Sequence, residues 1–368
     1  MNILAFLKRE PFLPVAILSA GLFMVFGDRW LEDLSNPGWF GCMFAWLFLA
    51  ILFSAFAVVR HAEGLAVLLG EPLGTLVLTL SVTGIEVMVI AAVMYTGPEG
   101  STVARDAMFA VVMIVLNGMV GLSLVLGGLK HHEQSYNLQG ANAFLAVILP
   151  LAVLSLILPN YAHAELGPVF SAPEAIFLIV MSAGLYAVFL AIQNVRHKNY
   201  FAAPKAEKAQ SEHHGHEAIS LTYHSVLLAL YLLPLVVLSK KLALPIDHGI
   251  RVLGAPSAIG GFLVAVLILS PESLGAGRAA LANQLQRSIN ILLGSVLATI
   301  SLTVPAVLVI GFITHQDIIL GLSSVNSTLL VLTLVLSMIT FGSSRTNVLH
   351  GAVHLLLFLA YLMLIFEK

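Results

Sequence analysis

Residues 70–95 read GEPLGTLVLTLSVTGIEVMVIAAVMY, and this stretch decides the fold of the chain. A helix of about 20 mostly apolar residues crosses a bilayer, so the stretch is long enough to span one. It nevertheless carries a carboxylate, Glu86, near its middle, where a charged side chain costs roughly 2.5–3.5 kcal/mol on insertion scales. Acids at that depth usually mark a pathway for ions or protons. The alternative is a lone acid that hydrogen-bonds to a neighbouring helix for packing alone.

Polar side chains lead along the same helix to Glu86. Thr75, Thr79, Thr83 and Glu86 are spaced i, i+4, i+8 and i+11, so they share one helix face. A row of hydroxyls that ends at an acid is typical of a cation or proton path. We therefore expect Thr83 to bind the ion together with Glu86, and Thr79 and Ser81 to line the path.

The composition indicates a membrane protein. Of the 368 residues, 59% are hydrophobic and 10% are charged, and the mean hydropathy is +0.98, whereas a soluble domain carries about 25% charged residues. We expect an all-α polytopic fold whose partners are membrane lipid and transported cations. A net charge of −2 argues against a nucleic-acid partner. Whether several copies form a homo-oligomer stays open, and no cofactor is expected.

Eleven apolar segments are expected to cross the membrane. Lys8 and Arg9 precede the first segment and no small-residue cleavage site follows it, which indicates a retained helix rather than a signal peptide. The expected spans fall near residues 12–27, 39–59, 72–95, 106–128, 142–158, 173–194, 224–239, 256–277, 288–312, 325–341 and 348–366.

The distribution of Lys and Arg over the connections predicts the orientation. With the N-terminus inside, eleven of the 17 basic residues lie on the cytoplasmic side. An odd number of spans then places the C-terminus in the periplasm. Lys240, Lys241 and Arg251 cluster against the rule in one expected outer loop.

The second half of the chain repeats the pattern of the first. Residues 256–277, PSAIGGFLVAVLILSPESLGAG, again form an apolar run with one acid, Glu272. Pro271 is expected to break the helix beside that acid, as Gly84 weakens the helix beside Glu86. Broken helices at membrane depth expose carbonyls that bind cations, and inverted repeats place the site at the midplane.

The repeat predicts four parts of the chain. They are an extra N-terminal helix in 1–35, a five-helix repeat with Glu86 in 36–195, a cytoplasmic histidine-containing linker in 196–223, and a five-helix repeat with Glu272 in 224–368.

The span after each acid carries polar residues on an apolar background. The first repeat has Asn117, and the second has Ser288, Ser295, Thr299 and Thr303 on one helix face. Two carboxylates that meet in low dielectric become neutral by taking up protons or by binding a metal cation. We expect one midplane site, with Thr303 lining its path, formed by Glu86, Glu272, Thr83, Ser270, Asn117, Ser295 and Thr299.

Protons and a cation would then compete for one pocket, and alternating access turns this competition into antiport. A hard cation such as Ca²⁺ takes about 6–8 oxygen ligands, which suits carboxylates, hydroxyls and an amide. The sequence does not rank Ca²⁺, Na⁺ and K⁺. A passive cation channel that uses the same two acids is the alternative.

Three strings carry a resemblance to a known family. They are LLGEPLGTLVLTLSVTGIEV at 68–87, VMIVLNGMVGLSLVLGGLKHHEQ at 112–134 and SPESLGAGRAALANQLQRSINILLGSVLATISLTVPAV at 270–307. The chain resembles the calcium/cation antiporter superfamily, in its cation/proton exchanger branch of bacterial calcium/sodium:proton antiporters. The resemblance matches the glutamates of the family's two repeat motifs to Glu86 and Glu272. It implies ten helices in two inverted repeats plus one extra helix, export of Ca²⁺ or Na⁺ against H⁺, and a bacterial inner membrane.

Other candidate groups remain open. His213, His214 and His216 either bind a regulatory metal or belong to a solvated linker. His350 and His354 are spaced i, i+4 on the last span, where they either relay protons or pack as ordinary helix residues. No H-E-x-x-H, G-x-S-x-G or Walker motif is present, so an enzyme or a primary pump is not expected.

Overall fold

The structure is a computed structural model that describes residues 6, 8–70, 73–96, 100–162, 168–202, 220–254, 256 and 258–367. In these ranges nine helices are long and apolar enough to cross a membrane, and two shorter apolar helices accompany them. The all-α polytopic fold is therefore confirmed. Each of the eleven expected spans coincides with one of these helices, but the two shorter ones leave the count of eleven as a prediction. His213, His214 and His216 lie outside the described residues.

The chain forms two compact units. Unit 1 comprises Met1–Val103 and His216–Pro271, and unit 2 comprises Ala104–Gly215 and Glu272–Lys368. Helices α6 (Gly100–Met113) and α14 (Ala258–Leu281) are divided between the units. Unit 1 otherwise contains α2 (Phe12–Val25), α3 (Gly27–Glu32), α4 (Pro37–Leu69), α5 (Leu73–Thr96) and α13 (Leu221–Leu253).

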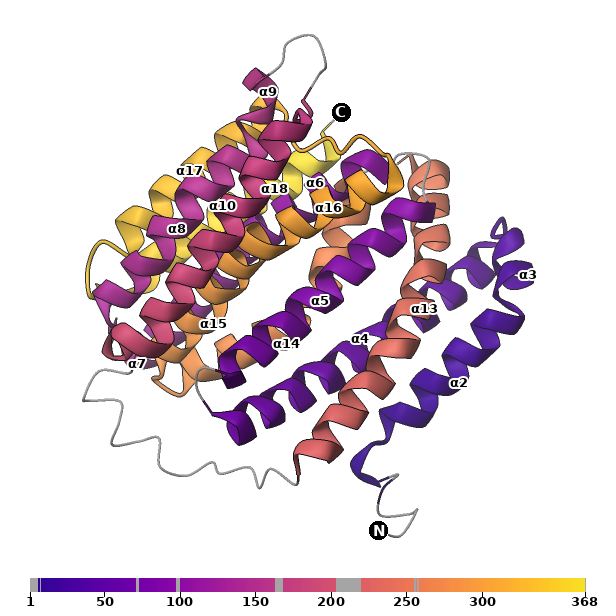
Figure 1. Ribbon diagram of the computed structural model, residues 1–368, viewed down its shortest axis with the longest axis horizontal. Coiled ribbons are helices and arrows are strands. Elements are labelled where there is room, and N and C mark those ends of the chain that lie inside the picture. Colours follow the sequence, from indigo (N-terminus) through magenta and orange to yellow (C-terminus); the bar gives the residue numbers. More distant parts are fainter. Residues whose placement is uncertain are drawn as a thin grey trace. The chain divides into compact units, whose positions relative to one another are not determined.

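In unit 1, α4 and α13 pack against each other, α5 packs against both, and α2 covers them from the other side (Figure 1). Residues at its two ends determine where α4 begins and ends. Asn36 accepts hydrogen bonds from the N–H groups of Gly38 and Trp39, and Pro37 takes the first helical position. The helix ends at Gly70, whose φ of 64° favours glycine. Gly74 then lets α5 begin close to α4, because a Cβ there would lie 2.2 Å from the Ala66 carbonyl oxygen.

Two expected boundaries in unit 1 are wrong. Helix α4 continues past the expected end at residue 59 to Leu69, so Arg60 lies within the helix and not in a connection. The sequence predicted a short span at 224–239 followed by a loop with Lys240 and Lys241, whereas α13 continues through Pro234 and Pro245 to Leu253. Spanning helices tolerate proline because neighbouring helices and local adjustments satisfy the freed backbone groups. Lys241 extends from this helix to form an ion pair with Asp28. The orientation of the chain, which used these lysines as loop charges, stays a prediction.

Unit 2 is built around two long helices that each contain a π-helical segment. Residues Thr102–His131 and Leu285–Thr314 each form a continuous helix of 30 residues. The elements in unit 2 are η1 (Ile114–Met119), α7 (Val120–His131), β1 (Gln134–Ser135), α8 (Leu138–Leu156), α9 (Pro159–Ala162), α10 (Ala172–Ala191), η2 (Ile192–Arg196), α11 (Lys198–Phe201), α15 (Leu285–Ala298), η3 (Thr299–Thr303), α16 (Val304–Thr314), α17 (Ser324–Thr340), β2 (Arg345–Thr346) and α18 (Val348–Phe366).

Close helix packing positions the centre of unit 2. Helix α18 packs along α7 and η1, and α15 packs against η1 and α8. Gly121 and Gly351 make the α7–α18 crossing possible, because a Cβ on either residue would lie within 3 Å of the carbonyl oxygen of the other. The strands β1 and β2 pair antiparallel, with Gln134 opposite Thr346, and join the ends of this helix pair.

Candidate cation site

The first expected site acid lies in α5 of unit 1. Glu86 is 4% exposed and Thr83 is 5% exposed, which is deep burial for a carboxylate. The Thr83 hydroxyl oxygen is buried and has no hydrogen-bond partner among the described residues. Thr79 and Ser81 are half-buried, and the Ser81 hydroxyl donates to the Val77 carbonyl at 2.7 Å.

The two acid-bearing helices are not broken, which corrects the expectation for Gly84 and Pro271. Helix α5 runs unbroken from Leu73 to Thr96 and α14 from Ala258 to Leu281. Gly84 costs an α-helix only about 1 kcal/mol, which packing offsets. Pro271 cannot donate to the Leu267 carbonyl, and spanning helices tolerate such a proline because neighbouring groups satisfy the freed carbonyl. The hydroxyl of Ser270 beside it donates to the Val266 carbonyl at 2.6 Å.

Instead, the chain departs from regular α geometry in the helix that follows each acid-bearing helix. Segment η1 holds Asn117 and segment η3 holds Thr299, Ser301 and Thr303. A π-helical turn contains one extra residue and occurs frequently at functional sites. Each expected repeat thus carries a π segment in its third helix. Sequence reasoning selected Asn117, Thr299 and Thr303 as polar residues but did not anticipate the change in helix type.

The second expected site acid lies at the start of unit 2. Glu272 is half-buried, and its side chain hydrogen-bonds to the Ser295 hydroxyl. Its Oε2 atom is buried without a hydrogen-bond partner in the described part of the chain. The structure therefore brings together Glu272 of α14 and Ser295 of α15, and Thr299 follows one turn beyond Ser295 on the same helix.

Asn117 is held by a hydrogen-bonded network in unit 2. Its Nδ2 donates to Thr333 Oγ1 at 2.8 Å, and its Oδ1 lies 3.3 Å from His354 Nδ1. His354 Nε2 lies 2.9 Å from Thr340 Oγ1. All four side chains are fully buried. Because Asn117 Oδ1 can only accept a hydrogen bond, we assign the ring proton of His354 to Nδ1.

The expected site residues thus fall into two described groups. Glu86, Thr83, Thr79, Ser81 and Ser270 belong to unit 1, and Glu272, Asn117, Ser295, Thr299 and Thr303 belong to unit 2. Each group is described within its own unit, so the meeting of Glu86 and Glu272 in one pocket stays a prediction.

The donor atoms of both groups suit a hard cation. In the described ranges, no three His, Cys, Asp or Glu side chains lie close enough to hold a metal ion. Each described group supplies one of the two expected carboxylates, together with hydroxyl oxygens and, in unit 2, the Asn117 amide oxygen. Oxygen ligands of this kind suit Na⁺, K⁺ and Ca²⁺ rather than thiophilic metals.

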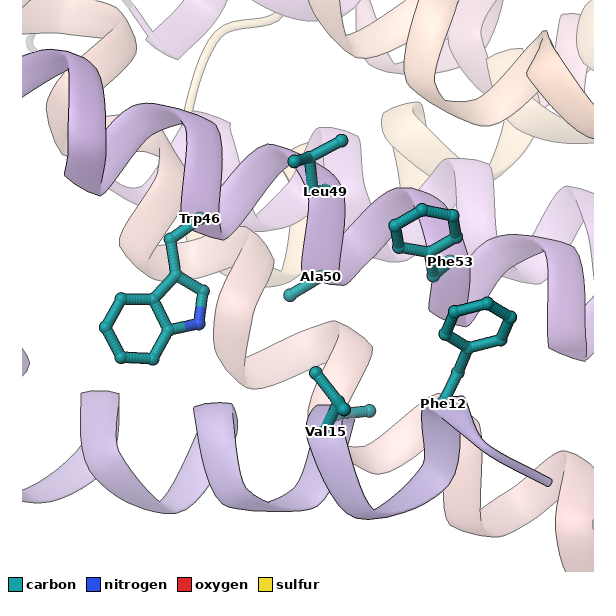
Figure 2. A pocket seen from close by; sticks show the side chains of 7 residues that line it. Phe12, Val15, Trp46, Leu49, Ala50 and Phe53 are labelled. Carbon is teal, nitrogen blue, oxygen red and sulfur yellow. The ribbon is translucent and has the colours of Figure 1, made fainter. Parts of the chain in front are cut away.

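A cavity in unit 1 lies away from these groups. It measures about 170 Å³ and is formed by α2 and α4 (Figure 2). Phe12 and Phe53 stack at its edge with ring centroids 4.6 Å apart. Its lining is almost wholly apolar and carries no acid, so it offers no ligand to a cation. The lining residues are Phe12, Val15, Ala16, Trp46, Leu49, Ala50 and Phe53.

Comparisons with known proteins find similar sequences. The profile of the sodium/calcium exchanger protein family matches residues 39–195 and 223–367. The sodium-potassium/proton antiporter ChaA of Escherichia coli (strain K12) is 44% identical over 321 residues, which cover 86% of this chain and 87% of that protein. The putative ionic transporter y4hA of Sinorhizobium fredii (strain NBRC 101917 / NGR234) is 45% identical over 313 residues, covering 84% and 85%.

Solved structures share the fold. The structure of native YfkE superposes with a TM-score of 0.75 and covers 97% of this chain and 100% of that chain, at 17% sequence identity.

Proposed function

Because the chain belongs to the sodium/calcium exchanger family, we propose that it is a secondary antiporter that exchanges a metal cation for protons. An acid on each of two membrane-spanning helices, the buried Glu86 on α5 and the half-buried Glu272 on α14, carries this proposal. An acid retained in apolar surroundings must take up a proton or bind a cation to become neutral. A transporter whose acids either take up a proton or bind a cation can exchange one for the other without catalysing a chemical reaction.

In the proposed mechanism, Glu86 and Glu272 face one midplane pocket that opens to each side of the membrane in turn. A cation bound between them is also held by Thr83, Ser270, Ser295, Thr299 and Asn117. Protons that enter from one side neutralise the carboxylates and release the cation. When the protons leave on the other side, the restored negative charge binds the next cation.

The proposed ions are Na⁺ and K⁺, with Ca²⁺ as a further substrate. The Escherichia coli relative, at 44% identity, is named a sodium-potassium/proton antiporter, and the matching family is described by sodium and calcium. The nine apolar spans of the described chain, together with bacterial relatives, support a multi-pass bacterial inner-membrane protein. We place its N-terminus in the cytoplasm and its C-terminus in the periplasm.

Everted membrane vesicles test the proposal. The vesicles are energised to establish a proton gradient, and Na⁺, K⁺ or Ca²⁺ is then added while the gradient is followed with a fluorescent dye. Antiport predicts collapse of the gradient that depends on the cation. Glu86→Gln and Glu272→Gln should each reduce this collapse by at least about 100-fold, which corresponds to losing a buried charged ligand worth roughly 3 kcal/mol.

Two exposed acids provide matched controls. Glu32→Gln in unit 1 and Glu133→Gln in unit 2 make the same chemical change at solvent-exposed positions and should leave exchange unchanged. Full exchange by both buried-acid variants at normal expression would refute the proposed site. Cation flux that follows membrane voltage with no requirement for a pH gradient would show a passive channel instead.

A further inference from the structure

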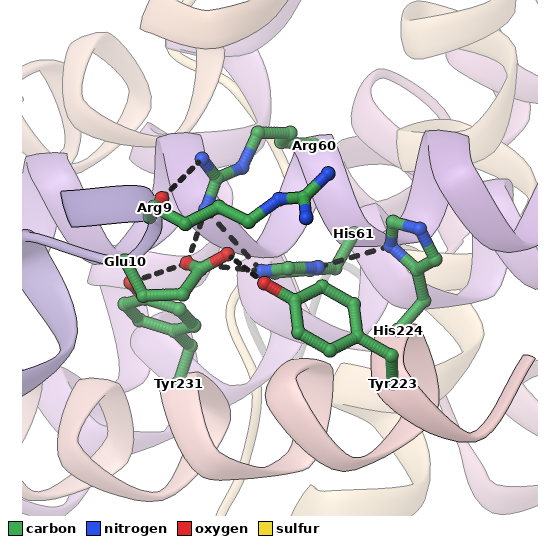
Figure 3. Close-up of polar contacts among 7 residues, drawn as sticks. All are labelled: Arg9, Glu10, Arg60, His61, Tyr223, His224 and Tyr231. Atoms are coloured by element: carbon green, nitrogen blue, oxygen red, sulfur yellow. Dashed lines mark hydrogen bonds and ion pairs between the residues drawn. The ribbon is translucent and has the colours of Figure 1, made fainter. Parts of the chain in front are cut away.

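A cluster of buried ionisable side chains in unit 1 lies outside the proposed cation site (Figure 3). Glu10, immediately before α2, is 1% exposed. Its Oε1 accepts a hydrogen bond from Tyr223 at 2.8 Å, and its Oε2 accepts one from Tyr231 at 3.0 Å. Arg60 forms an ion pair with the same carboxylate, and the side chain of Arg60 is 50% exposed. The cluster is therefore buried at its centre and open to solvent at one edge.

Glu10 stays ionised throughout the physiological range. Burial raises its pKa, but hydrogen bonds from His61 and Tyr223 and the positive charge of Arg60 outweigh burial and lower the pKa to about 2. At neutral pH the carboxylate is therefore only an acceptor of hydrogen bonds. It fixes the orientation of every donor around it.

The carboxylate determines the protons of two histidines. His61 Nε2 lies 3.3 Å from both Glu10 Oε2 and Arg60 Nη2. Arg60 only donates and already pairs with the carboxylate, so we assign the proton on Nε2 to the bond with Glu10. His61 Nδ1 lies 3.1 Å from His224 Nδ1. In neutral His61 that Nδ1 is an acceptor, and His224 Nδ1 must then be the donor. His224 Nε2 is left as a buried lone pair with no hydrogen-bond partner among the described residues.

One more proton disrupts this arrangement at either nitrogen that can receive it. On His61 Nδ1 it would make both facing atoms donors, unless His224 moved its own proton from Nδ1 to Nε2. In that case, as when the proton goes directly to His224 Nε2, a buried N–H arises that has no acceptor among the described residues. The ring of His224 cannot withdraw towards Gly64, because it lies so close to α4 that a Cβ at Gly64 would be 2.4 Å from it.

The charged surroundings of the histidine pair come from three elements. The residues before α2 contribute Arg9 and Glu10, α4 contributes Arg60 and His61, and α13 contributes Tyr223, His224 and Tyr231. Arg9 lies over the ring of Tyr223, 5.9 Å from its centroid. Among the described residues, two arginines and one carboxylate leave one positive charge beside the pair, which further opposes an additional proton.

We propose that Glu10, His61 and His224 form a proton-sensing clasp that holds α2, α4 and α13 together and loosens when the histidine pair takes up a proton. Helix α4 also packs against α5, which carries Glu86. Loosening the clasp therefore weakens the support of an acid-bearing helix and slows exchange as the pH at this edge falls. This proposal rests on the proposed function only for its effect on exchange.

Thermal unfolding tests the clasp without any transport. The purified full chain in detergent should lose about 3 °C or more in Tm between about pH 8 and about pH 5.5, because histidines of the unfolded chain take up protons near pH 6.5 whereas the buried pair opposes them. In His224→Asn the amide nitrogen takes the place of Nδ1 but cannot be protonated, so at least half of that loss should disappear. His248→Asn makes the same change farther along α13, where the ring lies beside Phe40, and should retain the wild-type loss.

Glu10→Gln is a second test in case His224→Asn does not fold. It removes the anion that orients His61 and should lower Tm at about pH 8 by at least as much as acidification lowers the Tm of the wild type. Glu86→Gln, which the proposed function makes inactive in exchange, should keep the wild-type dependence of Tm on pH. An unchanged pH dependence of Tm in His224→Asn, or a wild-type Tm in Glu10→Gln, would overturn the clasp whatever the chain transports.

Vesicle assays then measure the regulatory effect. The pH is lowered below about 6.5 on the side of the membrane where the clasp lies. The exchange rate of the wild type should then fall by a factor at least about three times larger than that of His224→Asn. His248→Asn should follow the wild type. Parallel profiles for His224→Asn and the wild type would overturn the regulatory role, even if exchange itself depends on Glu86 and Glu272 as proposed.

Discussion

Of the three π-helical segments in the described part of unit 2, η1 and η3 occupy corresponding places in the sequence, but their polar groups differ in whether they have hydrogen-bond partners. In η1, both polar atoms of the Asn117 side chain have protein partners, Thr333 and His354. In η3, the hydroxyls of Ser301 and Thr303 are buried with no hydrogen-bond partner among the described residues. A buried hydroxyl without a partner costs about 1–3 kcal/mol. The first segment is therefore fixed by its neighbours, whereas the second retains oxygens that are available to a ligand.

The sequence predicts Asn117 and hydroxyls of η3 together as parts of one cation site. From the structure we instead infer a structural role for Asn117 and a binding role for η3. Asn117 can offer a cation only the second lone pair of an oxygen that already faces His354. Thr303 has an unused hydroxyl one helical turn beyond Thr299, on the face shared with Ser295. We expect substitutions in η1 to affect stability first, and substitutions in η3 to affect cation binding first.

Asn117→Leu should produce the largest effect. The change leaves the Thr333 hydroxyl and His354 Nδ1 buried without their partner, so we expect a loss of about 2–4 kcal/mol in unfolding free energy. Exchange should be lost together with folded protein. Thermal unfolding and yield in detergent measure the loss of stability, with Asn326→Leu at the start of α17 as a control. Wild-type Tm with lost exchange would instead make Asn117 a direct ligand.

His354→Phe should have the next largest effect. The ring keeps its volume but removes both nitrogens, which leaves Asn117 Oδ1 and the Thr340 hydroxyl without partners at a cost of about 1–3 kcal/mol. His354→Asn restores one donor near Nδ1 and should recover part of the lost Tm. His350→Phe, one turn away, serves as the matched control. Equal Tm for both phenylalanine variants would show that the network does not stabilise η1.

These contrasts mark what the sequence could predict. Hydrophobic length identified the spans, and a single acid in each of two apolar runs identified Glu86 and Glu272. Helical spacing also placed Ser295 and Thr299 on one face, and the structure adds that Ser295 hydrogen-bonds to Glu272. These predictions use only the period of a helix and the cost of a buried charge, which are local properties.

The remainder depends on packing between distant segments. Pro271 was expected to break α14, but that helix runs without a break from Ala258 to Leu281. The π turns arise where a helix is offset by one residue against its neighbours, and no local pattern records that offset. The clasp was missed because Glu10 and His61 are 51 residues apart and His61 and His224 are 163 apart.

Thr303→Val tests whether η3 binds the cation, and it should change the stability least of these variants. Valine matches threonine in shape and removes a buried hydroxyl that has no described partner, so Tm should stay within about 2 °C of the wild type or rise. Exchange should nevertheless need a higher cation concentration, with the half-maximal concentration raised about three- to tenfold, the equivalent of about 1 kcal/mol of lost cation binding.

Ser301→Ala is the matched control for this last prediction. Ser301 belongs to the same π segment and its hydroxyl is equally buried, but it lies two residues from Thr303 and off the face shared with Thr299. Its half-maximal cation concentration should therefore match that of the wild type. If Ser301→Ala raises this concentration as much as Thr303→Val does, the effect belongs to the flexibility of η3 and not to a hydroxyl that binds the cation. If neither variant changes it, the unpartnered oxygens of η3 have no part in cation binding, and the contrast with η1 concerns folding alone.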